Sequence, residues 1–431
     1  MHSLRTWKKP GAFAIYLTLS GGSALFMSLI FTVNVLYHTT VVQLSPLQLV
    51  LVGTILEGTV FLGEIPTGLL ADLKSRRLSV IIGYALMGVG FCIEGSWPIF
   101  WGVALSQVLW GLGYTFTSGA TEAWIVDELG EERAGEAFMR GSQAGQIGGL
   151  LGIPASAALA HVGLTLPILL GGVLMIGLAL YLAAYMPEDG FRPTPAKDRT
   201  TWQSMAKTLG DARRMVGRQP LLGIMLGIGL FYGLYSEGVD RLWTLHVLDI
   251  GLPALGALQP VTWFALIKIV GQFISLGATE LARRRVDTRH PEVMSRVLLL
   301  AAGLIVCSLV GLGLARSIWV ALALLWGIGA LRSITGPLYG AWFNAHIDDP
   351  QVRATMFSAS SQVDSIGQVG GGSLIGAVGD LVSVRAALAT SALLLAPVLP
   401  LYGAVQRRLA RLVATTTPGT RGPRPGKGKA R

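Results

Sequence analysis

Charged residues are scarce in this 431-residue chain: Asp, Glu, Lys and Arg make up only 13% of it, whereas 52% is hydrophobic. A soluble globular protein normally has about a quarter charged residues. A long chain with half that share does not expose most of its surface to water. Disorder outside the C-terminal tail is excluded, because disordered segments are poor in hydrophobic residues. The composition therefore predicts an integral membrane protein.

The sequence also has little that indicates an enzyme or a metalloprotein. Its two cysteines, Cys92 and Cys307, lie in apolar stretches and are interpreted as small buried hydrophobic residues rather than a disulfide framework. No G-x-x-x-x-G-K-[ST] motif is present, and no soluble segment is long enough for an ATPase domain. We find no metal cluster and no Ser/His/Asp constellation, because the histidines are scattered among tail, loops and helix ends: His2, His38, His161, His246, His290 and His346. We therefore expect no catalytic residues, no metal and no cofactor, so that any transport runs on a proton or other ion gradient, or downhill.

Long apolar runs are what the sequence has instead. A membrane-spanning helix needs about 20 mostly apolar residues. Twelve stretches meet that requirement, and glycine is frequent in them, as where membrane helices pack closely. They are 12–37, 46–71, 78–97, 99–126, 142–160, 165–186, 220–246, 254–281, 294–314, 317–345, 355–380 and 383–406.

The cations predict how this all-α membrane protein is oriented. With the N-terminus placed in the cytoplasm, 29 of the 34 Lys and Arg residues fall in the N-terminal segment, the cytoplasmic loops or the tail. Only Arg316 and Arg385 fall in outer loops, and Arg241, Lys268 and Arg332 lie inside helices. This follows the positive-inside rule, so we expect a multi-pass protein of the cell (inner) membrane with both termini cytoplasmic. The same placement explains the net charge of +10 without a nucleic-acid partner.

The chain divides into two sets of six helices. Residues 187–219 form the longest polar interruption, which separates an N-terminal bundle (1–186) from a C-terminal bundle (220–412). The Pro-, Gly- and cation-rich tail (413–431) is expected to be disordered near the anionic lipids of the inner leaflet, as a functional basic segment or, more simply, a solvated anchor.

An internal repeat relates the two sets. "WGLGYTFTSGATEAW" at 110–124 resembles "WGIGALRSITGPLYGAW" at 326–342. "ERAGEAFMRGSQAGQIGG", ending at Gly149, resembles "VRATMFSASSQVDSIGQVGG", ending at Gly371. Two matches in the same order indicate a parallel repeat of six helices, which is the arrangement of major facilitator transporters, with the substrate site between the halves.

The stretch between the second and third helices makes the resemblance specific. The chain reads G-L-L-A-D-L-K-S-R-R from Gly68 to Arg77, which resembles the major facilitator superfamily signature G-x-L-A-D-R-x-G-R-K, with Leu73 and Ser75 departing from it. The resemblance covers residues 12–406 and implies a twelve-helix fold of two pseudo-symmetric halves. It also implies that Gly68, Asp72, Arg76 and Arg77 form a gating motif. Asp72 would face the positive N-terminal end of the eleventh helix and latch the halves shut; alternatively, the two arginines only fix the topology.

Two weaker resemblances concern drug exporters of the superfamily. Gln107–Gly113 reads Q-V-L-W-G-L-G, which lacks the arginine of the proton-antiporter pattern R-x-x-Q-G-x-G. Gly149–Pro154 reads G-L-L-G-I-P, which is similar to an exporter pattern with its proline displaced by one position. The second resemblance favours efflux.

Charges inside predicted membrane helices are the main functional candidates, since they are costly there. Glu237, Asp240 and Arg241 follow one another in the seventh helix at spacings that place them on roughly one face. Desolvation and a neighbouring carboxylate favour the protonated form of an acid, so Glu237 and Asp240 are candidates for proton coupling. Alternatively, Glu237 and Arg241 form a fixed structural pair.

Further candidates lie on other helices. Glu64 and Asp364 have matching depths on the second and eleventh helices, which adjoin in the family, and are predicted to pair and to take part in proton coupling. Lys268 and Arg332 could each hold a substrate anion or neutralise a carboxylate of the seventh helix; the preferred roles are counter-ion for Lys268 and cavity residue for Arg332. Other candidates for the cavity wall include aromatic residues that are equally well explained by packing: Asn34, Tyr37, Arg241, Trp243 and Tyr339.

The sequence thus predicts a monomeric secondary active transporter that contacts membrane lipids and a small-molecule substrate. Proton-coupled efflux by alternating access is the preferred function. A symporter or uniporter for a small organic anion is the alternative suggested by Arg332 and Lys268. A transporter-like receptor or a membrane enzyme is a more remote possibility.

Overall fold

The computed structural model describes residues 10–193, 210, 214, 216–217, 220–253, 260–347 and 350–416, and within them every regular element is a helix. The first half of the chain forms α1 (Ala12–Thr40), α2 (Pro46–Leu73), α3 (Arg76–Ser96), α4 (Phe100–Thr117), α5 (Ala120–Leu129), α6 (Glu131–Ala160) and α7 (Thr165–Tyr185). The second half forms α9 (Pro220–Ile250), α10 (Pro260–Arg285), α11 (Pro291–Leu314), α12 (Ile318–Asn344), α13 (Pro350–Leu381), α14 (Val384–Leu395) and α15 (Val398–Thr416).

Within the described residues, each of the twelve predicted stretches lies on one helix or on two successive helices; residues 254–259 of the eighth stretch lie outside them. The fourth stretch divides into α4 and α5 at Gly119, whose φ of 72° is a left-handed conformation that suits glycine. The last stretch divides at Pro397, which lies between α14 and α15 and has no backbone N–H for a continuous helix. The fold class predicted from the sequence is thus confirmed.

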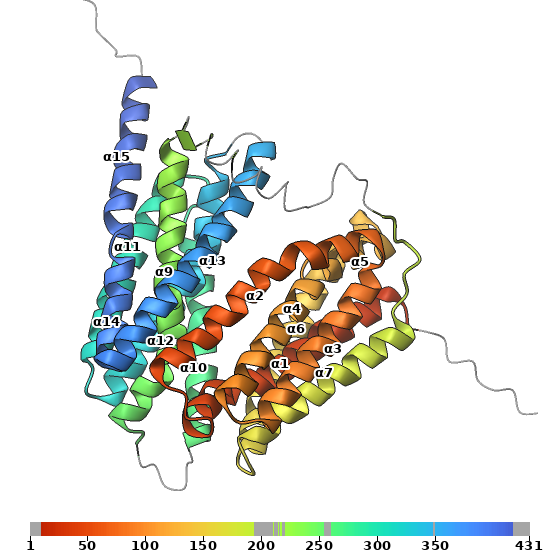
Figure 1. Cartoon of the computed structure of the whole chain (residues 1–431). Helices are drawn as coiled ribbons and strands as arrows, with labels where there is room; N and C mark the ends of the chain where they lie inside the picture. Colours follow the sequence, from red (N-terminus) through yellow and green to blue (C-terminus); the bar gives the residue numbers. More distant parts are fainter. Residues whose placement is uncertain are drawn as a thin grey trace, which may run out of the picture.

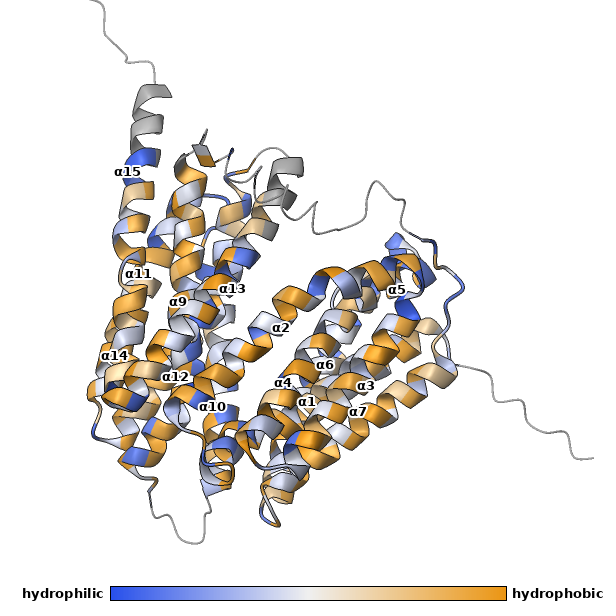
Figure 2. Ribbon diagram, viewed as in Figure 1, coloured by the Kyte–Doolittle hydropathy of each residue, from blue (hydrophilic) through white to orange (hydrophobic). Residues whose placement is uncertain are grey.

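Nine helical segments of the described chain are long and apolar enough to span a membrane by length and composition alone. The helices α4, α6 and α13 are outside that set because Gly, Ser, Thr and Gln lower their hydropathy. Figure 2 shows hydrophobic residues along most helices and hydrophilic ones gathered near helix ends, for example around α5 and on α15.

Some predicted boundaries differ from the structure. The predicted turn LLADLKSRR is mostly helical: α2 continues to Leu73, and Ser75 already caps α3 by accepting a hydrogen bond from the backbone N–H of Leu78. The fifth predicted helix begins earlier, at Glu131, because its polar first turns are helical too. Similarly, α15 continues to Thr416, and the rest of the tail and most of the central loop lie outside the described residues.

The helices form two bundles, α1–α7 and α9–α15, that meet at one end and diverge toward the other (Figure 1). We call the diverging end the basic end, since it carries Lys74, Arg76, Arg77 and the last turn of α10 (Arg283–Arg285). The distal end carries the α1–α2 connection and the α13–α14 connection.

Corresponding helices pack alike in the two bundles. A Cβ at Gly148 of α6 would collide with the backbone of Gly21 of α1. A Cβ at Gly371 of α13 would collide with the backbone of Leu234 of α9. Glycine therefore allows α1 to approach α6, and α9 to approach α13, at backbone distance. The second repeated segment of the sequence lies on α6 and α13, and α1 and α9 are the helices that pack against it.

The bundles touch each other near the distal end. The carboxylate of Asp380, on α13, accepts hydrogen bonds from the Ser45 hydroxyl at 3.0 Å and the Leu47 backbone N–H at 2.9 Å, at the start of α2. The Lys268 ammonium of α10 donates to the backbone carbonyl of Phe31 in α1. Since these contacts hold the distal end closed, the polar space between the halves opens toward the basic end.

Candidate functional site

Three cavities among the described residues are lined by residues that the sequence predicted for the site. The acidic cavity, about 490 Å³, lies between α2, α4 and α13 and is lined by Glu57, Glu64 and Asp364. The tyrosine cavity, about 540 Å³, lies between α9, α12 and α13 and is lined by Tyr232, Tyr235 and Tyr339. The two share Ser361, Asp364 and Gln368 and so lie next to each other. The distal cavity, about 300 Å³, lies closer to the closed end.

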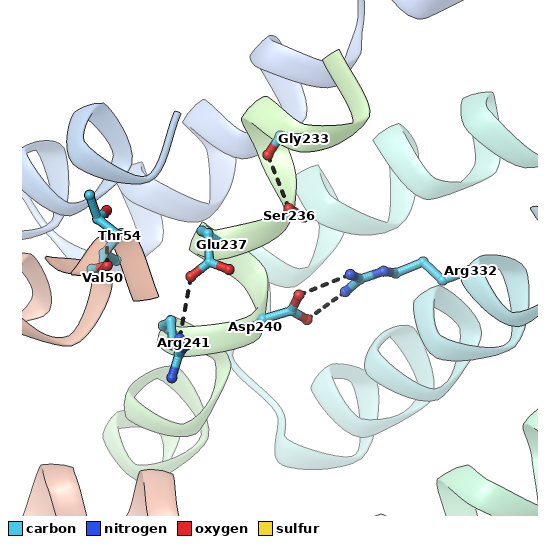
Figure 3. Close-up of polar contacts among 8 residues, drawn as sticks. All are labelled: Val50, Thr54, Gly233, Ser236, Glu237, Asp240, Arg241 and Arg332. Atoms are coloured by element: carbon cyan, nitrogen blue, oxygen red, sulfur yellow. Dashed lines mark hydrogen bonds and ion pairs between the residues drawn. The ribbon is translucent and has the colours of Figure 1, made fainter. Parts of the chain in front are cut away.

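The charges of α9 form two ion pairs that point in different directions (Figure 3). Glu237 pairs with Arg241 one turn later, with 3.3 Å between Oε2 and Nε. Asp240 reaches across to α12, where Arg332 donates two hydrogen bonds to its carboxylate at 2.5 and 2.9 Å. The spacing does place all three on roughly one face of α9, but Asp240 points away from the Glu237–Arg241 pair. Asp240 is offset by about 60° from Glu237, because three residues turn a helix by about 300°.

The Glu237–Arg241 pair lies where α9 contacts α2. The side chain of Glu237 is 9% exposed. A Cβ at Gly53 of α2 would collide with its carboxylate and lie 3.1 Å from Nε of Arg241. The absence of a side chain at Gly53 thus provides the space that this pair occupies between the halves.

The Asp240–Arg332 pair lies on the wall of the open space. Both residues line the tyrosine cavity, and their side chains are 46% and 33% exposed. The guanidinium carbon of Arg332 is 5.8 Å from the ring centroid of Tyr235. This pair is therefore held by a bidentate contact and is accessible from the cavity.

Glu64 and Asp364, predicted to pair, both line the acidic cavity, but no hydrogen bond joins them. Asp364 accepts a hydrogen bond of 2.7 Å from the Gln368 amide. Glu64 is exposed on the opposite wall, because α2 and α13 diverge toward the basic end.

The other predicted cavity residues have mixed positions. Arg241, Trp243 and Lys268 line the distal cavity, and Tyr339 lines the tyrosine cavity while donating to the carbonyl of Met225 at 2.7 Å. The prediction that Lys268 neutralises a carboxylate of α9 is not what the structure shows, since its ammonium donates to the Phe31 carbonyl. Arg332 does line the tyrosine cavity, and there it also pairs with Asp240.

For Tyr37 the structure favours packing, the alternative explanation, over a place in a cavity wall. Tyr37 is 0% exposed, and its hydroxyl donates to the backbone carbonyl of Glu94 in α3 at 2.7 Å. Asn34, one turn earlier, does line the distal cavity, and its amide donates to the Glu94 carboxylate at 2.5 Å. His38 contacts the same carboxylate oxygen at 2.9 Å.

Glu94 is thus a buried residue that the sequence analysis missed. It is 0% exposed, and its second oxygen, Oε2, has no hydrogen-bond partner within the described residues. A glutamate within the apolar stretch 78–97 meets the criterion that selected the other membrane-embedded charges, so the sequence does contain the indication.

The residues of the predicted gating motif lie at the basic end of α2 and α3. Arg76 forms an ion pair with Asp127 of α5, and Arg77 donates to the carbonyl of Ala183 in α7 at 2.5 Å. A Cβ at Gly68 would meet nothing within 4 Å, and Asp72 has no hydrogen bond or ion pair within the described residues. Both arginines therefore bind within their own half.

Two helical bundles around a shared polar space are the architecture of a membrane transporter built from two halves. Comparisons with known proteins identify its family. The chain belongs to the major facilitator superfamily, whose sequence profile matches residues 16–372. It is 22% identical to the uncharacterised MFS-type transporter YxaM of Bacillus subtilis (strain 168), over 77% of this chain and 80% of that protein. The family consists of transporters rather than enzymes, so this protein is a multi-pass membrane transporter.

Solved structures show the same fold. The nucleoside transporter NupG (D323A mutant) superimposes with a TM-score of 0.72 at 12% identity, covering 93% of this chain and all of that one. A bacterial homologue of the human lysosomal transporter Spinster, in an inward-facing and unoccupied conformation, gives 0.69 at 17% identity, covering 93% and 97%.

Proposed function

We propose that this transporter is a proton-coupled exporter, which moves a small organic solute out of the cell by alternating access. The observation that carries the proposal is the Asp240–Arg332 pair, which joins α9 to α12 beside the open space. The similarity of Gly149–Pro154 to an exporter pattern supports the direction. The concentration of Lys and Arg at the basic end supports placing that end, and both termini, in the cytoplasm.

Protonation of Asp240 would change what holds α9 to α12. The carboxylate binds Arg332 through two charge-assisted hydrogen bonds, which are stronger and more directional than neutral ones. A neutral carboxyl group attracts the guanidinium far less, which would release Arg332 toward the tyrosine cavity. Glu237 lies next to it at the contact with α2, so a proton there would alter the contact between the halves. Proton binding and movement of the halves thus share one segment of α9.

The alternative of an organic-anion symporter or uniporter rested on Arg332 and Lys268. Arg332 is neutralised by Asp240, and Lys268 is hydrogen-bonded to Phe31. Only Lys268, whose partner is an uncharged carbonyl, keeps its positive charge available, and it lies at the distal cavity, so this alternative has less support than export.

We expect the exporter to lower the accumulation of at least one fluorescent dye in a pump-deficient bacterial host. The panel would contain cationic, neutral and anionic dyes, and accumulation would be followed with and without a protonophore. Asp240→Asn is expected to reduce the export rate at least tenfold, since an amide cannot exchange a proton. Asp249→Asn is the matched control, because Asp249 is exposed on the same helix.

Three outcomes would contradict this function. Unchanged or raised accumulation of every dye would count against export. Export that persists with the protonophore, or in Asp240→Asn at the wild-type rate, would show that coupling does not run through this pair.

A further inference from the structure

We propose, resting on the proposed function, that the exported solute is an organic cation bound in the acidic cavity. Three carboxylates line this cavity, Glu57 and Glu64 from α2 and Asp364 from α13. None of its described lining residues is Lys, Arg or His. Glu57 and Glu64 have no hydrogen bond or ion pair within the described part of the chain. Carboxylates that share a partly desolvated space repel each other, and a positive charge between them relieves that cost.

A second observation in the cavity points to a hydrogen-bond donor. Gln362 lines the same space and is only 8% exposed, yet its carbonyl oxygen has no hydrogen-bond partner in the described structure. Buried polar atoms are nearly always satisfied, so an orphaned acceptor beside a cavity indicates a missing donor. An amine or another cationic head group supplies both the donor and the charge.

The size and the aromatic wall of the cavity favour an organic cation over a bare metal ion. The volume of about 490 Å³ is within the range of small-molecule sites. Trp110 and Tyr114 of α4 provide aromatic rings on its wall, and Tyr114 is 50% exposed. Aromatic faces attract organic cations, because the face of the ring carries negative charge density. The nearest arginine pairs do not compete, since Arg241 and Arg332 are neutralised by Glu237 and Asp240.

The test compares two probes of nearly equal shape and opposite charge, tetraphenylphosphonium and tetraphenylborate. Equilibrium binding to the full chain in phosphatidylcholine nanodiscs would be measured, with empty nanodiscs to subtract partition into lipid. We expect saturable binding of the phosphonium and none of the borate. Glu57→Gln and Asp364→Asn should each weaken phosphonium binding at least fivefold, whereas Glu136→Gln, exposed on α6 outside the cavity, should not.

A positive charge introduced at the cavity wall provides a second test, which does not depend on removing a carboxylate that the fold needs. Ser361 is exposed and lines both the acidic and the tyrosine cavity, so Ser361→Lys is expected to fold and to abolish phosphonium binding. Borate binding without phosphonium binding, or equal phosphonium affinity in all variants, would overturn the proposal. Because no gradient is applied, this result is separate from the outcome of the dye-export experiment.

A second, independent observation concerns the pattern of the gating motif. Gly68–Arg77 reads G-L-L-A-D-L-K-S-R-R, and Gly376–Arg385 reads G-A-V-G-D-L-V-S-V-R. They share G-x-x-x-D-L-x-S-x-R. In each, the aspartate is the last residue but one of a helix, and the serine caps the next helix: Ser75 accepts from Leu78 N–H at 2.8 Å and Ser383 from Ala386 N–H at 3.1 Å. The first copy ends α2 at the basic end, and the second ends α13 at the distal end.

We infer that Asp380 is a distal latch, the counterpart of Asp72 at the other end of the same helix pair. Asp380 binds the hydroxyl and N–H groups at the N-terminus of α2, where the helix dipole favours a negative charge. Gly376 and Gly379 let α2 approach, since Cβ atoms there would lie 3.1 Å from Leu47 Cα and 2.8 Å from Pro46 Cβ. At the basic end, Gly68 faces open space. Asp380 is therefore bound to the other half where the halves touch, whereas Asp72, where they diverge, has no such contact within the described residues.

Spin labels that report the separation of the halves would test the latch. In a chain without Cys92 and Cys307, one pair would be placed at Val162 and Leu314 of the distal end and another at Glu132 and Glu292 of the basic end. Asp380→Ala is expected to lengthen the distal distance and shorten the basic one in a tenfold larger fraction of molecules. Asp249→Ala, an exposed acid near the distal end of α9, is the control. Unchanged distance distributions in Asp380→Ala would overturn the inference.

Discussion

Gly371→Val is expected to prevent the C-terminal bundle from assembling. A Cβ at Gly371 would lie 2.5 Å from both Cα and the carbonyl carbon of Leu234 and closer still to its carbonyl oxygen. These are backbone atoms of α9, so no side-chain rotation relieves the collision. Overpacking of a core commonly costs about 1–3 kcal/mol when side chains can shift. Moving two helices apart costs more, because the contacts along their whole length are lost.

The adjacent glycine gives the control. A Cβ at Gly370 would meet nothing within 4 Å, and Gly370→Val adds the same side chain to the same helix. Size-exclusion chromatography of detergent-solubilised protein should show Gly370→Val as a single sharp peak and Gly371→Val as aggregate. Two equally sharp peaks with equal thermal unfolding midpoints would show that α9 and α13 do not depend on this contact.

The repeated sequence predicted this packing only in part. The two Gly-Gly segments that end at Gly149 and Gly371 indicated equivalent helices, and α6 and α13 do pack against α1 and α9. In the first copy, however, Gly148 is the contact and a Cβ at Gly149 would meet nothing within 4 Å, whereas in the second copy the last glycine is the contact. The rotation of a helix about its axis depends on its partner, so sequence similarity alone does not predict which glycine faces it.

The sequence predicted which residues belong to the candidate site better than it predicted which of them pair with one another. Glu237, Asp240, Arg241 and Arg332 were selected because charges are costly in membrane helices, and the structure brings them together. Which carboxylate of the seventh helix Arg332 would pair with was not predicted, since the relation between α9 and α12 is a tertiary property. The second copy of the aspartate motif, Gly376–Arg385, was missed for another reason. It lies at the distal end, whereas the first copy lies at the basic end, and a parallel repeat places equivalent segments at the same end.

Glu94→Ala is expected to lower the stability of the N-terminal bundle more than any exposed carboxylate substitution. The carboxylate accepts from Asn34 and contacts His38, and both of these residues are 1% exposed. Without it, each buried group that loses its partner costs about 1–3 kcal/mol. The thermal unfolding midpoint in detergent should therefore fall clearly for Glu94→Ala, and less for Glu94→Gln, whose amide oxygen still accepts one hydrogen bond.

The comparison with Glu136→Ala separates this network from a general effect of removing an acid. Glu136 is exposed on α6, and its loss should leave the midpoint unchanged. The Asn34 side chain also lines the distal cavity, so the network joins the cavity wall to the interior of the first bundle. If Glu94→Ala unfolds at the wild-type temperature, the three side chains do not stabilise the bundle. Their burial would then have to be explained by a role in the transport cycle. The Oε2 atom of Glu94 is available for a contact in another conformation, since it has no hydrogen-bond partner within the described residues.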